Sequence, residues 1–228
     1  MKTGWRIEAP QIALILLMFA VAAVAWPMAP DRIPVHWNIS GEVDRYGGKI
    51  EGLLLMPLMA AGIYLLMRFL PKIDPGRANY ARFGGVYATI RIAILAMMAL
   101  IQGLVLASVL WRPLDMSAAA PLLVGALFVL MGGLMGKIRP NWFVGIRTPW
   151  TLTSKVAWVR THRLGGWLFV AQGLLFILSG LAGVRAFHLV VIGSMFVVIV
   201  VLVVYSYVVW RSDPEKQSPA GTQPADDE

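Results

Sequence analysis

The residues best suited to chemistry gather in one basic stretch, residues 137–163, which is rich in Trp, Gly and Pro. Its distinctive members are Asn141, Gly145, Arg147, Thr148, Pro149, Thr151, Trp158, His162 and Arg163. Guanidinium groups bind carboxylates and phosphates, and Trp side chains settle at membrane interfaces. The stretch could therefore dock an anionic or acidic partner, or it could pin two neighbouring helices at a membrane surface.

A second polar stretch, residues 31–51, contains groups that could ligate a metal: His36 and Asp44, with Asp31 or Glu42. Such a cluster also forms an ordinary solvated surface with internal hydrogen bonds, and we favour that interpretation, so we expect no metal and no cofactor. Its proline and glycines predict extended chain and turns. The candidate residues of this loop are Pro34, His36, Asn38, Gly41, Asp44 and Lys49.

Neither stretch predicts an enzyme. The chain has no cysteine, and its three histidines lie in separate segments, at positions 36, 162 and 188. The sequence contains no Gly-x-Ser-x-Gly, His-Glu-x-x-His or phosphate-binding loop pattern. We therefore expect binding rather than catalysis.

Six long apolar runs must position these stretches. The composition is 58% hydrophobic. The runs cover residues 11–26, 53–70, 84–111, 116–136, 164–184 and 189–210. A helix of about 20 residues crosses a hydrocarbon core of about 30 Å. The expected fold is all-α, a polytopic membrane protein with six transmembrane helices, the first of them retained rather than cleaved as a signal peptide.

The positive residues predict the orientation of these helices. Fourteen of the twenty Lys and Arg residues fall in the segments that share a side with the amino terminus, and five fall opposite. Positive residues collect on the cytoplasmic side, so both termini and residues 137–163 are predicted to be cytosolic, with residues 31–51 outside. The net charge of +8 follows from this topology, and we expect no direct binding to nucleic acid.

Three polar residues fall within the predicted spans: Arg91, Gln102 and Gln172. The Arg91 side chain could snorkel to the lipid headgroups or pair with another group inside the protein. If these three residues line a polar path, the protein is a transporter of small solutes or ions. This is our second functional hypothesis. No Asp or Glu lies in the spans as predicted, which disfavours a proton relay.

Local patterns suggest how the helices are packed and connected. Small residues at 132, 133 and 136, and at 179, 180 and 183, predict two faces where helices approach closely. Thr148 and Pro149 suit the N-cap and first position of a helix. The apolar positions Leu152, Val156 and Val159 then predict a short helix on the membrane surface, with a bend at residues 165–166 leading into the fifth span.

The order of residues in the basic stretch resembles the signature of the SdpI family of bacterial immunity proteins. The matching segments are Gly136–Asn141, Gly145–Thr151, Trp158, Thr161–Arg163 and Gly166. Residues 33–38, with Gly41, Asp44, Tyr46, Gly47 and Lys49, are similar to a domain of unknown function that often precedes that signature. Together the two resemblances cover most of the chain.

The resemblance implies a bacterial inner-membrane protein that binds a secreted, membrane-active toxic peptide and confers immunity to it. It also implies sequestration of a cytosolic repressor, besides contact with membrane lipids. The expected organisation is a two-helix module at residues 1–82, a four-helix module at residues 83–210, and a disordered acidic tail at residues 211–228. The outer loop would meet the peptide and the basic loop the repressor.

Overall fold

The protein is described by a computed structural model covering residues 4–38, 40–111, 114–183 and 185–216. Its elements, in order, are α1 (Trp5–Ala25), β1 (Ile33–Trp37), β2 (Val43–Gly47), a π-helical turn (Ile50–Leu54), α2 (Leu55–Ile73), a 3₁₀ turn (Arg77–Asn79), α3 (Tyr80–Leu110), α4 (Met116–Met135), α5 (Pro149–Thr153), α6 (Lys155–Ala182) and α7 (Arg185–Arg211). The predicted connection at residues 112–115 and the predicted tail lie partly outside this description, at residues 112–113 and 217–228.

Within the described ranges, six helical segments are long and apolar enough to cross a membrane: Trp5–Ala25, Ile50–Ile73, Arg77–Leu110, Met116–Met135, Lys155–Ala182 and Phe187–Arg211. The prediction of six apolar helices able to cross a membrane is confirmed, whereas the fold is mostly helical and not the predicted all-α, because β1 and β2 pair as strands. Within residues 31–51, β1 and β2 pair as antiparallel strands, in keeping with the extended chain expected there, whereas residues 49–51 already begin the second helical segment.

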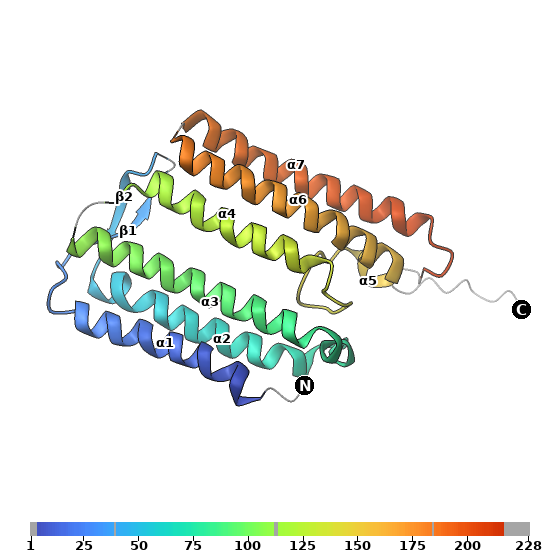
Figure 1. The fold of residues 1–228 in the computed structure, drawn as a ribbon, viewed down its shortest axis with the longest axis horizontal. Coiled ribbons are helices and arrows are strands. Elements are labelled where there is room, and N and C mark those ends of the chain that lie inside the picture. The colour runs from blue at the N-terminus through green and yellow to red at the C-terminus, as the bar shows by residue number, and fades with distance from the viewer. Residues whose placement is uncertain (1–3, 39, 112–113, 184, 217–228) are drawn as a thin grey trace, which may run out of the picture.

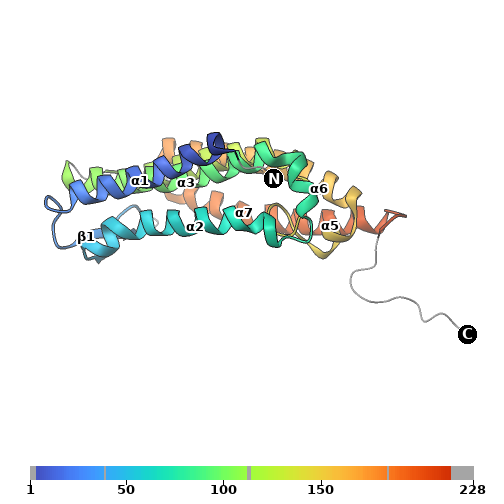
Figure 2. The same ribbon diagram turned by 90° about the horizontal axis from the view of Figure 1, so that it is seen from below.

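The long helices form two groups that lie side by side, α1–α3 in one and α4, α6 and α7 in the other (Figure 1, Figure 2). One end of the molecule carries the β hairpin, the end of α3, the start of α4, the end of α6 and the start of α7, and we call it the hairpin end. The other carries the start of α1, the end of α7, the α2–α3 connection, residues 136–148 and α5, and we call it the loop end. The two polar stretches therefore lie at opposite ends of the helices.

Glycines allow α4 and α6 to pack unusually closely. A β-carbon on Gly125 would lie 2.6 Å from the Gly173 carbonyl oxygen, and one on Gly132 would lie 2.6 Å from that of Gly166. Backbones can approach this closely only where side chains are absent. Of the small residues predicted to form such faces, Gly132 and Gly180 are used in this way, whereas a β-carbon on Gly133 would meet open space.

An aromatic cluster joins the two helix groups at the loop end. Tyr80, Phe83 and Tyr87 of α3 pack with Met135 of α4 and Trp158 of α6. The Tyr80 and Tyr87 rings meet edge to face, with centroids 5.1 Å apart. Such edge-to-face pairs add to the hydrophobic effect of burying the rings, and they fix the position of the loop end relative to both groups.

Two features of the helices differ from the prediction. The first helix begins at Trp5 rather than at residue 11, which places Glu8 inside a span. No separate surface helix spans residues 149–163. The chain instead breaks at Ser154, whose extended backbone and side chain cap α6, and α6 then runs unbroken through residues 165–166. Those glycines serve close packing instead of a bend, because Ile146 and the Gly132 carbonyl press against them.

Candidate functional site

Asn141 organises the loop between α4 and α5. Its side chain is buried, and all four of its hydrogen-bonding positions are used. Its amide nitrogen donates to the carbonyls of Arg139 and Val144, both at 2.9 Å. Its oxygen accepts from the N–H groups of Phe143, at 2.9 Å, and Val144, at 2.6 Å. One side chain thus holds the turn, and Asp could not replace it because Asp lacks the two donors.

Asp74, at the end of α2, attaches this loop to the first helix group. Its carboxylate is 1% exposed and accepts from the Gly76 N–H at 2.6 Å, the Tyr80 hydroxyl at 2.8 Å and the Trp142 N–H at 3.1 Å. Asn79 adds a bond from its amide to the Pro140 carbonyl at 2.8 Å. A buried carboxylate surrounded by donors is strongly held, so the α2–α3 connection clamps the loop.

Sequence reasoning missed Asp74. It lies in a connection that is otherwise basic and looked like an ordinary cytoplasmic loop. A signal was available, since an Asp directly before Pro-Gly suits a side chain that turns back on its own backbone, as the Gly76 bond shows. Nothing local indicated that a loop 68 residues away would supply another of its donors.

His162 holds the far side of the same loop. Its Nε2 accepts from the Ile146 N–H at 3.0 Å, so the ring hydrogen lies on Nδ1 and is donated to the Trp158 carbonyl at 2.8 Å. The His162 and Trp158 rings stack, with centroids 4.0 Å apart. Gly145 has a φ of 111°, and a β-carbon there would collide with Nε2. Only glycine suits this position, on grounds of both conformation and space.

Thr148 and Thr151 form a reciprocal capping box at the start of α5. The Thr148 hydroxyl accepts from the Thr151 N–H at 3.1 Å, and the Thr148 N–H donates to the Thr151 hydroxyl at 2.9 Å. With Pro149 at the first position, the predicted helix start is confirmed. The Thr148 hydroxyl also donates to the Ser206 hydroxyl of α7 at 3.0 Å, which ties α5 to the last helix.

The described part of the predicted tail folds back on this region. Asp213 is buried, and its carboxylate accepts from the Ser154 hydroxyl at 2.5 Å. The same hydroxyl accepts from the Ala157 N–H at 2.9 Å. Residues 212–216 are therefore ordered against the start of α6, which differs from the predicted disorder because a buried acceptor is satisfied there.

The predicted site residues thus divide into a buried scaffold and an exposed rim. Asn141, Thr148, Thr151, Trp158 and His162 are buried, while Gly145, Arg147, Pro149 and Arg163 are exposed. The other exposed basic residues of the stretch are Lys137, Arg139, Lys155 and Arg160. Arg147 donates from Nη1 to the Trp142 carbonyl at 2.7 Å, so the scaffold positions this exposed guanidinium. The rim offers one positioned guanidinium and further exposed cations for carboxylates or phosphates.

At the hairpin end, the candidate residues form one ordered hairpin. His36 Nδ1 lies 2.5 Å from the Asp44 carboxylate, and Asn38 Oδ1 accepts from the N–H groups of Ser40 and Glu42 at 2.8 and 3.1 Å. Pro34 pairs in register with Tyr46, and Lys49 donates to the Trp26 carbonyl at 3.2 Å. Gly41, with a φ of 77°, seats the hairpin on α4, because a β-carbon there would lie 2.7 Å from the Ser117 nitrogen.

The candidate metal ligands of this hairpin have other partners. Asp44 pairs with His36, Glu42 accepts from the Asn38 amide at 3.0 Å, and Asp31 lies 3.7 Å from the Lys49 ammonium. Over the described ranges, no three His, Cys, Asp or Glu residues gather in a way that could hold a metal ion.

The intramembrane polar residues bond between helices. Arg91 is buried and pairs with Glu8, its Nη1 and Nη2 lying 3.1 and 2.9 Å from the two carboxylate oxygens. This selects buried pairing over snorkelling. It also corrects the expectation that no carboxylate lies in a span. Gln102 donates to the Met18 carbonyl at 3.1 Å, and Gln172 donates to the Val191 carbonyl at 2.8 Å.

Comparison with known proteins confirms both resemblances found in the sequence. Residues 137–206 match the SdpI/YfhL protein family, and residues 13–61 match a domain of unknown function (DUF1648). The "Immunity protein SdpI" of Bacillus subtilis (strain 168) is 23% identical over 164 residues, covering 72% of this chain and 76% of that protein. No solved structure matches. The scaffold residues on α5 and α6 lie in the segment that matches the SdpI/YfhL family, and the hairpin lies in the segment that matches DUF1648. Asp74 lies between the two segments.

Proposed function

We propose that this protein is an immunity protein of a bacterial inner membrane. Residues 137–206 match the SdpI/YfhL family, and the chain is distantly related to an immunity protein. This protein protects its host by binding a membrane-active peptide at the hairpin end. It acts by binding and not by catalysis. The relationship to the immunity protein is the observation that carries this proposal, and the six apolar helices support its membrane setting.

The distribution of charge supports an orientation for this function. The exposed basic residues of the stretch at 137–163 lie at the loop end, together with the start of α1 and the end of α7. Under the positive-inside rule this end faces the cytosol, and the hairpin end faces the side from which a secreted peptide arrives.

A second part of the proposal concerns the cytosolic side. The exposed rim, with Arg147 held on a buried scaffold, suits docking of an acidic surface on a cytosolic repressor. Preorganised guanidinium groups lose less entropy on binding than freely rotating side chains do. Retention of a repressor at the membrane would couple peptide binding to gene expression.

Immunity is tested by expressing the protein in a sensitive bacterial strain and challenging it with a panel of secreted, membrane-active peptides. We expect a raised inhibitory concentration for at least one peptide. An unchanged inhibitory concentration across the panel, at a verified level of membrane insertion, would refute the proposal.

The docking role is tested with Arg147→Ala and Arg163→Ala, alone and together. We expect insertion and thermal stability to be retained while recruitment of a co-expressed cytosolic repressor to membranes falls. Arg32→Ala, which removes an exposed basic residue at the hairpin end, is the matched control. Loss of folded protein in the loop variants, with recruitment per folded molecule unchanged, would show that the loop only pins helices.

A further inference from the structure

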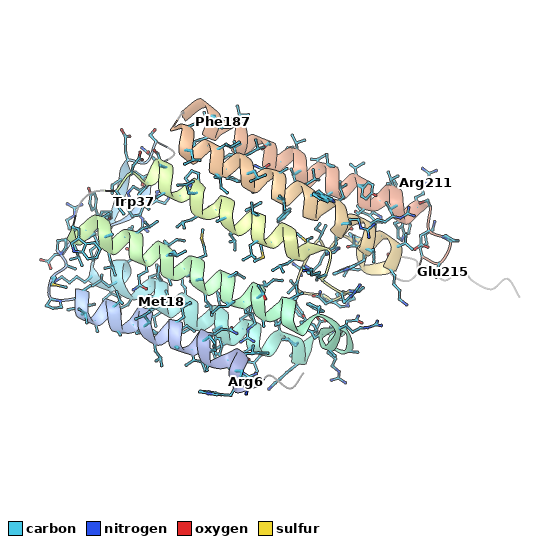
Figure 3. All side chains as sticks on the ribbon, viewed as in Figure 1. Arg6, Met18, Trp37, Phe187, Arg211 and Glu215 are labelled. Carbon is cyan, nitrogen blue, oxygen red and sulfur yellow. The ribbon has the colours of Figure 1, made fainter. Side chains whose placement is uncertain are left out.

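A small cavity lies at the hairpin end, where the hairpin meets α4, α6 and α7. Its volume is about 130 Å³. Its lining includes Asn38 of the hairpin, Met116 and Ser117 of α4, Phe176 of α6, and His188 and Ile192 of α7. Figure 3 marks this end with Trp37 on the hairpin and Phe187 at the start of α7. Met116, Phe176 and Ile192 make its wall largely apolar.

His188 is the polar group of this cavity that stands out. The residue is 6% exposed, and its Nε2 has no hydrogen-bond partner among the described residues. A buried polar atom without a partner is costly, and most such atoms in proteins are satisfied. Nε2 exposes less than 1 Å² of surface, so a ligand in the cavity would reach it only after a small turn of the His188 ring toward the cavity. A ligand that brings its own hydrogen-bonding group to Nε2 in this way would remove the cost.

The size and chemistry of the cavity together specify the ligand. An apolar cavity of about 150 Å³ can hold one benzene molecule, so this one has room for about one six-membered ring. The flexible thioether of Met116 can adapt to the ring. A phenol both donates and accepts a hydrogen bond, so it can pair with either tautomer of His188, whereas an indole only donates and is larger.

We propose that this cavity receives a tyrosine side chain of the membrane-active peptide, with the phenolic hydroxyl hydrogen-bonded to Nε2 of His188. The identification of the peptide as the source rests on the proposed immunity function. The site suits such a peptide because tyrosine collects at membrane interfaces, and a buried tyrosine hydroxyl usually takes a hydrogen-bond partner. The cavity therefore acts as the anchor pocket of the outer binding face.

The test uses p-cresol, which is the tyrosine side chain capped with hydrogen, and toluene, which lacks only the hydroxyl. The full-length protein is labelled with ¹⁵N-histidine and placed in lipid nanodiscs. Because the chain has three histidines, three sets of imidazole signals are expected, and His188→Gln identifies the third set. At equal membrane concentrations we expect p-cresol to shift the His188 signals, and to bind about 3- to 10-fold more tightly than toluene, the effect of one neutral hydrogen bond.

Two variants complete the experiment. His188→Leu should abolish the preference for p-cresol over toluene, while His36→Gln, which alters an exposed histidine at the same end, should leave it unchanged. The proposal is overturned if p-cresol shifts no His188 signal in the unmodified protein, or if toluene binds equally well. That comparison needs no variant, so a failure of His188→Leu to fold does not affect it.

The outcomes separate this proposal from the proposed function. A His188 response to p-cresol in a protein that protects against no peptide would leave the phenol site standing and remove the immunity function. Protection without any response to p-cresol would do the reverse.

Discussion

Removal of one partner from the buried Glu8–Arg91 pair should destabilise the protein severely. Glu8 is 4% exposed and Arg91 is 2% exposed, and two hydrogen bonds join them. Arg68 adds a second cation, its Nε lying 3.6 Å from the same carboxylate. Glu8→Gln would leave Arg91 buried without its countercharge and close to another cation. Breaking a buried pair in this way costs about 3–5 kcal/mol.

The expected change in melting temperature follows from the size of the chain. For 150–250 residues, 1 kcal/mol shifts Tm by about 2–4 °C, so Glu8→Gln should lower Tm by about 6–20 °C. Arg91→Met should lower it by a similar amount. The double variant should recover most of the loss, because removing both charges leaves no uncompensated ion in the interior.

The assay is thermal unfolding of the four proteins in one detergent, arranged as a double-mutant cycle. Glu51→Gln is the matched control, because its pair with Arg45 is partly exposed, with 57% and 33% of the Arg and Glu side chains accessible. Such a pair contributes about 1 kcal/mol or less, so its Tm should fall by no more than about 4 °C. The reasoning is refuted if the two single losses simply add in the double variant, or if Glu8→Gln behaves like the control.

Three further predictions concern the loops. Asp74→Ala removes the acceptor of the Trp142 N–H. Because a hydrogen bond to a charged group contributes about 1.5–3 kcal/mol, hydrogen exchange at that amide should accelerate by about 10- to 100-fold. Gly145→Ala forces a side chain into a left-handed conformation and against a buried histidine ring, so it should cost about 1–3 kcal/mol and lower the yield of folded protein. A hydrogen bond from the Ser117 hydroxyl holds the pKa of Asp115 below its usual range. The α4 cap is therefore fully stabilising above the unfolded pKa of about 3.9 and weakens as pH falls through the lower folded value, which Ser117 amide exchange would report.

Each of these has a control within the chain. Asp31→Asn alters a highly exposed carboxylate and should leave exchange at Trp142 unchanged. Gly133→Ala places a β-carbon in open space on a helix and should be neutral or stabilising. Asp115→Asn should weaken the pH dependence at the start of α4. Equal effects of the test and control substitutions would contradict the contacts described for the loops.

Sequence patterns alone predicted the features that depend on neighbouring residues. The helix start at Thr148 and Pro149 was predictable because a cap is made by residues three apart. The extended chain and turns of residues 33–47 followed from glycine and proline within 15 residues of one another, whereas the pairing of the two strands was not predicted. The buried roles of Trp158 and His162 were not predictable, because the same residue types in a basic stretch also suit a membrane surface, and only packing of the loop against α6 distinguishes the two.

Apolar length determined by itself that this chain crosses a membrane, since a run of about 20 such residues has no other favourable environment. The residue order around 137–163 carried the resemblance to the SdpI family. Tertiary structure alone decided that Glu8 lies in a span and meets Arg91, 83 positions away, and that Asp74 holds Trp142. The reason is physical: helix formation and membrane insertion depend on local composition, whereas a pair between distant residues exists only once the helices pack and exclude every other partner.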